Sequence, residues 1–312
     1  MTAIMQKPFG VSLVKIGEQN QDLVVVDADL QRVCDTDEFA SRFPERYFNV
    51  GVAEANMVGV ATGLALSGKT VFCGSFANFV AQRAGDQVSV GAAYMNTNIK
   101  LCGFEAALTS GSNGATHQCM LDLAIMRALP NIRVYDPLDA TDLCAIMEYE
   151  AKQPGPAYLR GIRRSAPRLI DVEQFPFKPG KAYHLREGRD VTLIASGLML
   201  ERTLQAADQL AGRGIEAQIL GMSCLKPLDE KGILQAARDT GCIVTAENHN
   251  IYGGLGSAVT EVVCQKHPVP VLRVGIPDQF GEVGSADYLA EKFHISVEDI
   301  VQAALRVIEL KN

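Results

Sequence analysis

The sequence has no run of lysine or arginine, and it carries a formal net charge of −7. Nucleic-acid phosphates and anionic lipids are bound by clustered positive charge, so the sequence predicts neither nucleic acid nor membrane as a partner. No segment approaches the roughly 20 apolar residues that span a bilayer, and the N-terminus lacks the basic-then-apolar pattern of a secretion signal. We therefore expect a cytoplasmic protein that acts on small molecules.

Paired cysteines are also missing from the sequence. Its eight cysteines are scattered, without a CxxC pair or a Cys/His cluster at metal-ligand spacing. Several lie within apolar runs, as Cys73 and Cys242 do. This pattern predicts small core residues in a reducing compartment, and no metal site on this chain.

Short β-branched runs alternate with longer amphipathic stretches along the chain, which at 312 residues is long enough for two domains. Such alternation is typical of βα units that wind a mainly parallel sheet. It predicts an α/β protein with two doubly wound domains. In the first half we expect strands at residues 23–27, 70–73, 99–103, 132–135 and 157–160, and helices at residues 53–67, 79–95, 118–129 and 140–150.

A proline-containing segment separates the two halves. Pro167, Pro176 and Pro179, with charged residues beside them, predict an extended linker. We therefore divide the chain into a domain at 1–165, a linker at 166–185 and a domain at 186–312. In the second domain we expect strands at residues 191–196, 217–221, 242–246 and 271–274, and helices at residues 200–212, 229–240, 256–265 and 297–310.

Three segments of the first half contain residues of catalytic type. Glu54 begins an otherwise apolar helix, where a glutamate more often offsets the helix dipole than takes part in catalysis. Phe76 and Phe79 share a helical face near a strand end, which alone indicates ordinary core. His117 follows a loop of small and polar residues, and histidine suits general acid–base work, although a structural histidine is nearly as common there.

The order and spacing of these segments resemble the pyrimidine-binding domain of transketolases, and the second half resembles their C-terminal domain. One such motif would be weak, whereas the ordered series is specific. The resemblance covers essentially the whole chain and rests on Asp27-Ala28-Asp29-Leu30, Gly51-Val52-Ala53-Glu54, Phe76-x-x-Phe79 with Arg83, Gly114-Ala115-Thr116-His117-Gln118, Pro130-Asn131-Ile132-Arg133-Val134, Leu159-Arg160, Ala246-Glu247-Asn248-His249 and Tyr252-Gly253-Gly254-Leu255-Gly256.

The resemblance implies a transferase that moves a two-carbon ketol unit from a ketose to an aldose with thiamine diphosphate as cofactor. Full-length transketolases precede this region with a diphosphate-binding domain that carries a Gly-Asp-Gly motif, and no Gly-Asp-Gly occurs in this sequence. A separate N-terminal partner subunit is therefore expected to supply the ligands for magnesium and the diphosphate. The family's paired sites imply two copies of this chain, associated through the dimer core, with two of the partner.

The resemblance also assigns roles at the cofactor site. Glu54 is expected to be the catalytic glutamate that hydrogen-bonds the pyrimidine ring of the cofactor. Phe76 and Phe79 are expected to form the aromatic wall on which that ring packs. Asp29 and Arg83 are expected to line the same end of the pocket.

At the substrate end, the resemblance implies that His117 contacts the donor's hydroxyls in catalysis. It implies that Arg160, helped by Lys7, binds the sugar phosphate. Three positions in the substrate channel depart from the family pattern, with other residues in place of an aspartate, a histidine and a serine: Asn113, Glu105 and Val33. These departures predict retained chemistry with altered sugar specificity, because Glu105 would repel a dianionic phosphate and Val33 offers it no donor.

Other enzymes of related architecture remain alternatives. The β subunit of a 2-oxo acid dehydrogenase and a fragment of deoxyxylulose phosphate synthase share this domain order, and the Gly-Ala-Thr-His-Gln segment favours transketolase over both. Copurification with a lipoyl-bearing acyltransferase would identify the dehydrogenase subunit. A catalytically inactive regulatory homologue is a further alternative, since a fold alone does not imply a function.

Overall fold

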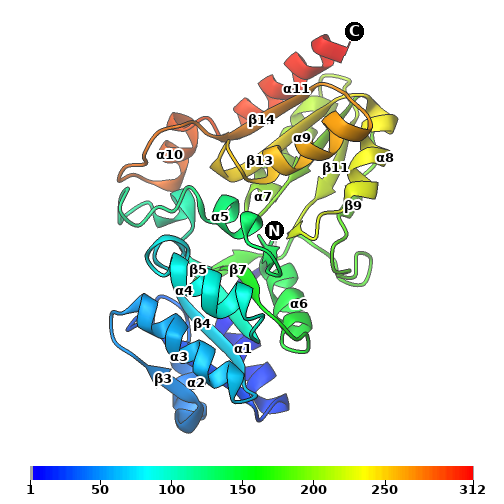
Figure 1. Ribbon diagram of the computed structural model, residues 1–312. Helices are drawn as coiled ribbons and strands as arrows, with labels where there is room; N and C mark the ends of the chain where they lie inside the picture. Colours follow the sequence, from blue (N-terminus) through cyan, green and yellow to red (C-terminus); the bar gives the residue numbers. More distant parts are fainter. Residues whose placement is uncertain (1–2, 312) are drawn as a thin grey trace.

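The computed structural model describes residues 3–311, and these form two α/β halves, each built around one sheet (Figure 1). The first half, blue to green in Figure 1, lies below the second half, yellow to red. This arrangement confirms the predicted fold class. Among the described residues, no helix combines the length and the apolar character needed to cross a membrane.

The sheet of the first half has seven strands in the order β12-β6-β7-β5-β4-β2-β3, and all but β12 run parallel. Every residue of β2, β4 and β5 is buried, because helices cover both faces of a parallel sheet. The strands are β2 (Leu23–Asp27), β3 (Tyr47–Asn49), β4 (Thr70–Phe76), β5 (Ile99–Phe104), β6 (Arg133–Tyr135), β7 (Ala157–Gly161) and β12 (Cys224–Lys226). The helices are α1 (Pro8–Gln19), α2 (Asp37–Arg42), α3 (Glu54–Leu66), α4 (Gly85–Gln87), α5 (Asp122–Ala128) and α6 (Ala140–Glu150).

The sheet of the second half has five strands in the order β14-β13-β10-β11-β9, with only β9 antiparallel. Its strands are β9 (Tyr183–Arg186), β10 (Val191–Ala195), β11 (Ala217–Gly221), β13 (Ile243–Asn250) and β14 (Val271–Ile276). Its helices are α7 (Met199–Ala211), α8 (Glu230–Thr240), α9 (Leu255–Lys266), α10 (Ala286–Lys292) and α11 (Val297–Lys311).

Each predicted strand overlaps an observed one, whereas β3 was not predicted, and three further features go beyond the prediction. The predicted linker contains two short strands, because β8 (Ser165–Pro167) pairs with β1 (Ile4–Gln6) and β9 opens the second sheet. Strand β12 belongs to the second half by sequence and to the first sheet by pairing. The helix expected at residues 79–95 is two π-helical segments, η2 (Phe79–Arg83) and η3 (Val88–Tyr94), on either side of α4.

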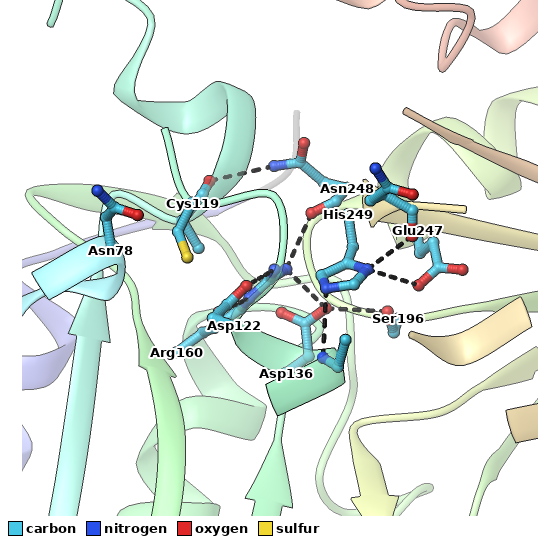
Figure 2. Close-up of polar contacts among 12 residues, drawn as sticks. Asn78, Cys119, Asp122, Asp136, Arg160, Ser196, Glu247, Asn248 and His249 are labelled. Atoms are coloured by element: carbon cyan, nitrogen blue, oxygen red, sulfur yellow. Dashed lines mark hydrogen bonds and ion pairs between the residues drawn. The ribbon is translucent and has the colours of Figure 1, made fainter. Parts of the chain in front are cut away.

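A buried ion network connects the two halves (Figure 2). Arg160, in β7, donates hydrogen bonds to both carboxylate oxygens of Asp122 at 2.7 and 2.8 Å. It also donates to Asp136, at 3.3 Å, and to the backbone carbonyl of Asn248 in β13, at 3.0 Å. Ser196 of the second half donates its hydroxyl to Asp136 at 2.9 Å. Arg160 is therefore bonded to residues of both halves.

Burial and the charge of Arg160 together set the protonation states in and around this network. Burial alone would raise the pKa of Asp122, but the charge and hydrogen bonds of Arg160 outweigh it and the pKa is lowered. Burial raises the pKa of Glu247 to about 7, against the N–H groups of Gly256 and Leu255 that donate to it. Burial likewise lowers the pKa of His249 to about 4, so this histidine is neutral near pH 7.

The substitution Arg160→Leu should lower the free energy of unfolding by about 3 to 5 kcal/mol, because it leaves buried carboxylates without their counter-charge. Urea denaturation of the purified chain measures this. The exposed Arg213 gives a matched control, and Arg213→Leu should change stability by less than about 0.5 kcal/mol. Equal effects of the two substitutions would contradict the structural role of Arg160.

Candidate active site

The carboxyl ends of the parallel strands bring the candidate residues to one edge of the first sheet. Phe76 ends β4, and its neighbour in the register is Phe104, which ends β5. Phe104 in turn pairs with Gly161 at the end of β7. Residues that follow these strands therefore lie side by side, which is where parallel α/β sheets bind ligands.

Glu54 is a buried carboxylate at the first position of α3, with 1% of its side chain exposed. Its Oε2 accepts a hydrogen bond from Arg83 at 2.9 Å, and its Oε1 accepts one from Ser75 at 3.3 Å. A buried charge is costly unless it is paired, so these two donors hold the carboxylate in place. The start of a helix also favours negative charge.

The π-helical segment η2 positions Arg83 toward Glu54. π-Turns are rare and occur frequently at functional sites. The Arg83 guanidinium carbon lies 4.1 Å from the centroid of the Phe79 ring, which adds a cation–π contact to the ion pair. The Arg83 side chain is 51% exposed, so this cation reaches Glu54 from the solvent side.

Three aromatic rings cluster beside this carboxylate. The His117 ring lies edge-on to Phe76 and to Phe79, with centroid distances of 5.0 and 5.2 Å, and the two phenylalanine rings are 5.7 Å apart. His117 also contacts the hydroxyl of Thr116 through Nδ1 at 3.0 Å. The structure thus brings together Glu54, Phe76, Phe79 and His117, which the sequence placed in three separate segments.

The second half holds the loop that carries His117. Gln118 donates a hydrogen bond to the carbonyl of Glu282 at 2.9 Å, and Gly284 donates one to the carbonyl of Gly111 at 3.1 Å. A Cβ atom at Gly111 would lie 2.5 Å from the Gly284 carbonyl oxygen, so this close approach requires glycine. One function of the second half is therefore to fix the loop at residues 111–118.

The other sequence-predicted residues are spread along the same edge or lie away from it. Asp29 is exposed after β2, with positive φ, and exchanges hydrogen bonds with Asn49. Asn113 is exposed in the loop and donates to Ser110 at 3.1 Å. Lys7 forms an ion pair with Asp37 at 2.9 Å rather than projecting alone. Val33 is partly buried in the first half.

Arg160 does not lie at an open anion site, in contrast to its predicted phosphate-binding role. It is buried in the network between the halves, and Asp122, Asp136 and a carbonyl group occupy its donors. Arg163 lies three residues further on, beyond the end of β7, and forms an ion pair with Glu105 at 3.0 Å. Neither Arg163 nor Ser75 was predicted from the sequence, although Arg163 lies only three residues beyond the Leu159-Arg160 motif.

The arrangement around Glu54 suits a flat heteroaromatic ring with a nitrogen that hydrogen-bonds a carboxylate. The cluster of Phe76, Phe79 and His117 offers aromatic surface, and Glu54 offers the oxygen atoms. Within residues 3–311 no three His, Cys, Asp or Glu side chains are grouped to hold a metal ion.

Two family models match the chain: the transketolase pyrimidine-binding domain over residues 3–168 and the transketolase C-terminal domain over residues 180–300. The fold and site thus define a pyrimidine-binding α/β unit joined to a second α/β unit. The chain belongs to the transketolase family and resembles the C-terminal subunit of split transketolases over nearly its whole length.

Three relatives show this similarity. The 6-deoxy-6-sulfo-D-fructose transketolase subunit SqwH of Clostridium sp. (strain MSTE9) is 45% identical over 300 residues, 96% of this chain and 93% of that protein. An apulose-4-phosphate transketolase subunit of Phocaeicola vulgatus is 34% identical over 304 residues, 97% of each chain. A solved split-gene transketolase, described as an inactive beta4 tetramer, is 41% identical, with a TM-score of 0.89 and 98% of each chain covered.

A double-mutant cycle tests the Glu54–Arg83 pair as a stabilising contact. Arg83→Met should destabilise the chain more than Glu54→Gln does, because it leaves a buried carboxylate unpaired, and the double variant should recover much of the loss. We expect a coupling energy of about 1 to 2 kcal/mol, since Arg83 is half exposed. The exposed pair Lys15–Glu148 is the control, with an expected coupling near zero. Equal coupling energies for the two pairs would contradict the assignment.

Proposed function

We propose that this chain is the pyrimidine-binding subunit of a heteromeric transketolase, which transfers a two-carbon ketol unit from a ketose to an aldose. The observation that carries the proposal is the buried Glu54 carboxylate beside the cluster of Phe76, Phe79 and His117. This geometry matches the requirements of a ring that must be held flat and hydrogen-bonded at one nitrogen. Thiamine diphosphate, when bound, supplies the electron sink for the reaction.

The chain's own residues then hold the bound ring and the donor in position, and they exchange protons with them. Glu54 presents an oxygen atom to the pyrimidine nitrogen, and Ser75 fixes the orientation of that carboxylate from its other oxygen. Phe76 and Phe79 exclude water from one side of the ring. His117, on the loop that the second half supports, is placed to contact the donor's hydroxyl groups as an acid or base.

The diphosphate and its magnesium ion belong, in this proposal, to a separate partner subunit. The support is the similarity to two transketolase subunits and to a split-gene transketolase, each matched over 93–98% of its length. Exposed apolar side chains on α3 and η3, which contact each other, are suited to association with a second copy of this chain: Leu66, Val90 and Tyr94. An assembly of two copies with two partners follows.

The donor in this proposal is a ketose with an anionic end, and xylulose 5-phosphate is not the best donor substrate. Glu105, Asn113 and Val33 replace the residue types usual for a pentose phosphate. The two relatives named for their substrates are a 6-deoxy-6-sulfo-D-fructose transketolase and an apulose-4-phosphate transketolase, which supports sugar donors of unusual shape or charge.

The isolated chain should neither bind thiamine diphosphate tightly nor catalyse ketol transfer, and mixing with the partner should restore both. Titration calorimetry of the separate proteins and of the mixture, with magnesium present, measures the binding. Coupled assays of the same samples measure turnover. Micromolar binding of the cofactor by this chain alone would contradict the proposed division of the site.

The variant Glu54→Gln should abolish most turnover of the complex while the fold is retained. The amide keeps the side-chain volume but cannot exchange a proton with the cofactor, and losses of this kind cost several kcal/mol of barrier. Turnover at saturating cofactor and circular dichroism are the measurements, with Glu173→Gln, an exposed carboxylate, as control. Retention of more than about a tenth of the activity would show that the carboxylate is misassigned, since tenfold is only about 1.4 kcal/mol.

A further inference from the structure

Glu105 and Arg163 form an ion pair beside the candidate cofactor site. Glu105 directly follows β5, whose neighbour β4 ends at Phe76. Arg163 follows β7, the neighbour of β5 on its other side. The pair therefore lies at the same edge of the sheet as Phe76, at the carboxyl ends of neighbouring strands. The distance between Arg163 Nη1 and Glu105 Oε1 is 3.0 Å.

This pair has the features of a binding element rather than of a surface contact. Only 23% of the Arg163 side chain and 13% of the Glu105 side chain are exposed. Glu105 has a φ of 53°, a conformation that non-glycine residues rarely adopt and that concentrates at functional sites. Arg163 Nε is a buried donor without a hydrogen-bonding partner among the described residues. Such a donor is costly unless a ligand or an ordered water pairs with it.

Other charged groups lie near the pair, and Asp35 interacts electrostatically with Arg163. Burial raises the pKa of Asp35, whose carboxylate accepts a hydrogen bond from the Arg164 backbone N–H. Lys7 is engaged with Asp37. Asp27, Asp35 and Arg163 all act on the buried Cys34, and Lys7, Asp37 and Arg163 all act on Asp35, so these charges share the neighbourhood of the pair. Arg163 thus offers a cation with a free buried donor, and Glu105 offsets part of its positive charge.

Resting on the proposed function, we infer that Glu105 and Arg163 form the anion end of the donor site and select a monoanionic terminus, a sulfonate, over a dianionic phosphate. A phosphate monoester carries about two negative charges at pH 7, because its second pKa is near 6. One arginine neutralises one of these charges, and Glu105 repels the other. A sulfonate carries one charge and can accept hydrogen bonds from Arg163 while Glu105 stays paired.

The test uses the complex of this chain with its diphosphate-binding partner and three donors that differ at the terminus. They are 6-deoxy-6-sulfo-D-fructose, D-fructose 6-phosphate and the neutral L-erythrulose. We expect kcat/KM for the sulfonate to exceed that for the phosphate by about tenfold or more. Glu105→Gln should lower this ratio about tenfold, mainly by improving the phosphate donor, and Glu148→Gln, in an exposed pair elsewhere, should leave it unchanged.

Two further measurements separate binding from structural effects. Arg163→Met should reduce kcat/KM for both anionic donors and leave L-erythrulose unaffected. As the pH falls from 8 to 5.5, the phosphate donor gains a proton that it can donate to Glu105. In the wild-type complex, the ratio of kcat/KM for the sulfonate to kcat/KM for the phosphate should therefore fall through about pH 6. In Glu105→Gln this pH dependence should flatten. The wild-type profile decides the question even if the variant fails to fold.

The outcomes distinguish failure of the proposed function from failure of the charge selection by Glu105 and Arg163. If no donor supports ketol transfer, the proposed function fails. If L-erythrulose or a charged ketose is processed but the phosphate equals or exceeds the sulfonate at pH 8, the proposed function stands and the charge selection is overturned. A ratio that is insensitive to Glu105→Gln and to pH would also overturn it.

Discussion

The fold depends on one buried cation. Arg160 lies where β7 of the first half meets β13 of the second half, and its guanidinium is surrounded by Asp122, Asp136 and a carbonyl group. A charge in this position is tolerated only because every neighbour is a matched acceptor, since an isolated buried ion would cost several kcal/mol. The same requirement constrains how α5 and β13 approach each other, because the hydrogen bonds are short and directional.

The same contacts also constrain the edge of the first sheet at which the carboxyl ends of its parallel strands meet. Asp122 begins α5, and the loop that ends four residues earlier carries His117, so anchoring Asp122 also anchors the end of this loop. The segment at residues 282–284 of the second half fixes the loop from the other side. The second domain is therefore part of the scaffold that holds His117, although it contributes no residue to the aromatic cluster beside Glu54.

The Glu54 site is open to solvent on the side of Arg83. Arg83 is half exposed and reaches Glu54 from solvent, and exposed apolar side chains such as Tyr94 and Val90 lie on η3. Positive φ values at Asp29 and Glu105 mark the same edge, as expected where a protein maintains a strained geometry for binding. The charged side chains Glu54 and Glu105 at this edge are thus already paired within the chain, with Arg83 and Arg163.

Local signals in the sequence were enough to predict the α/β class and most strand positions, because hydrophobic alternation spans short segments. The ordered motifs around Glu54, Phe76 and His117 indicated the family, and the roles expected at the cofactor end rest on that resemblance. The roles of Arg160 and Arg163 emerged from the folded chain alone. Arg160 lies near the end of β7 and Arg163 follows this strand. Their spacing does not indicate which of the two side chains faces the interior. Successive strand residues point to opposite faces, and the contacts that distinguish these arginines, Asp122 with Arg160 and Glu105 with Arg163, come from residues 38 and 58 positions away. The place of β12 in the first sheet likewise depends on long-range pairing, which leaves no periodic trace in a three-residue strand.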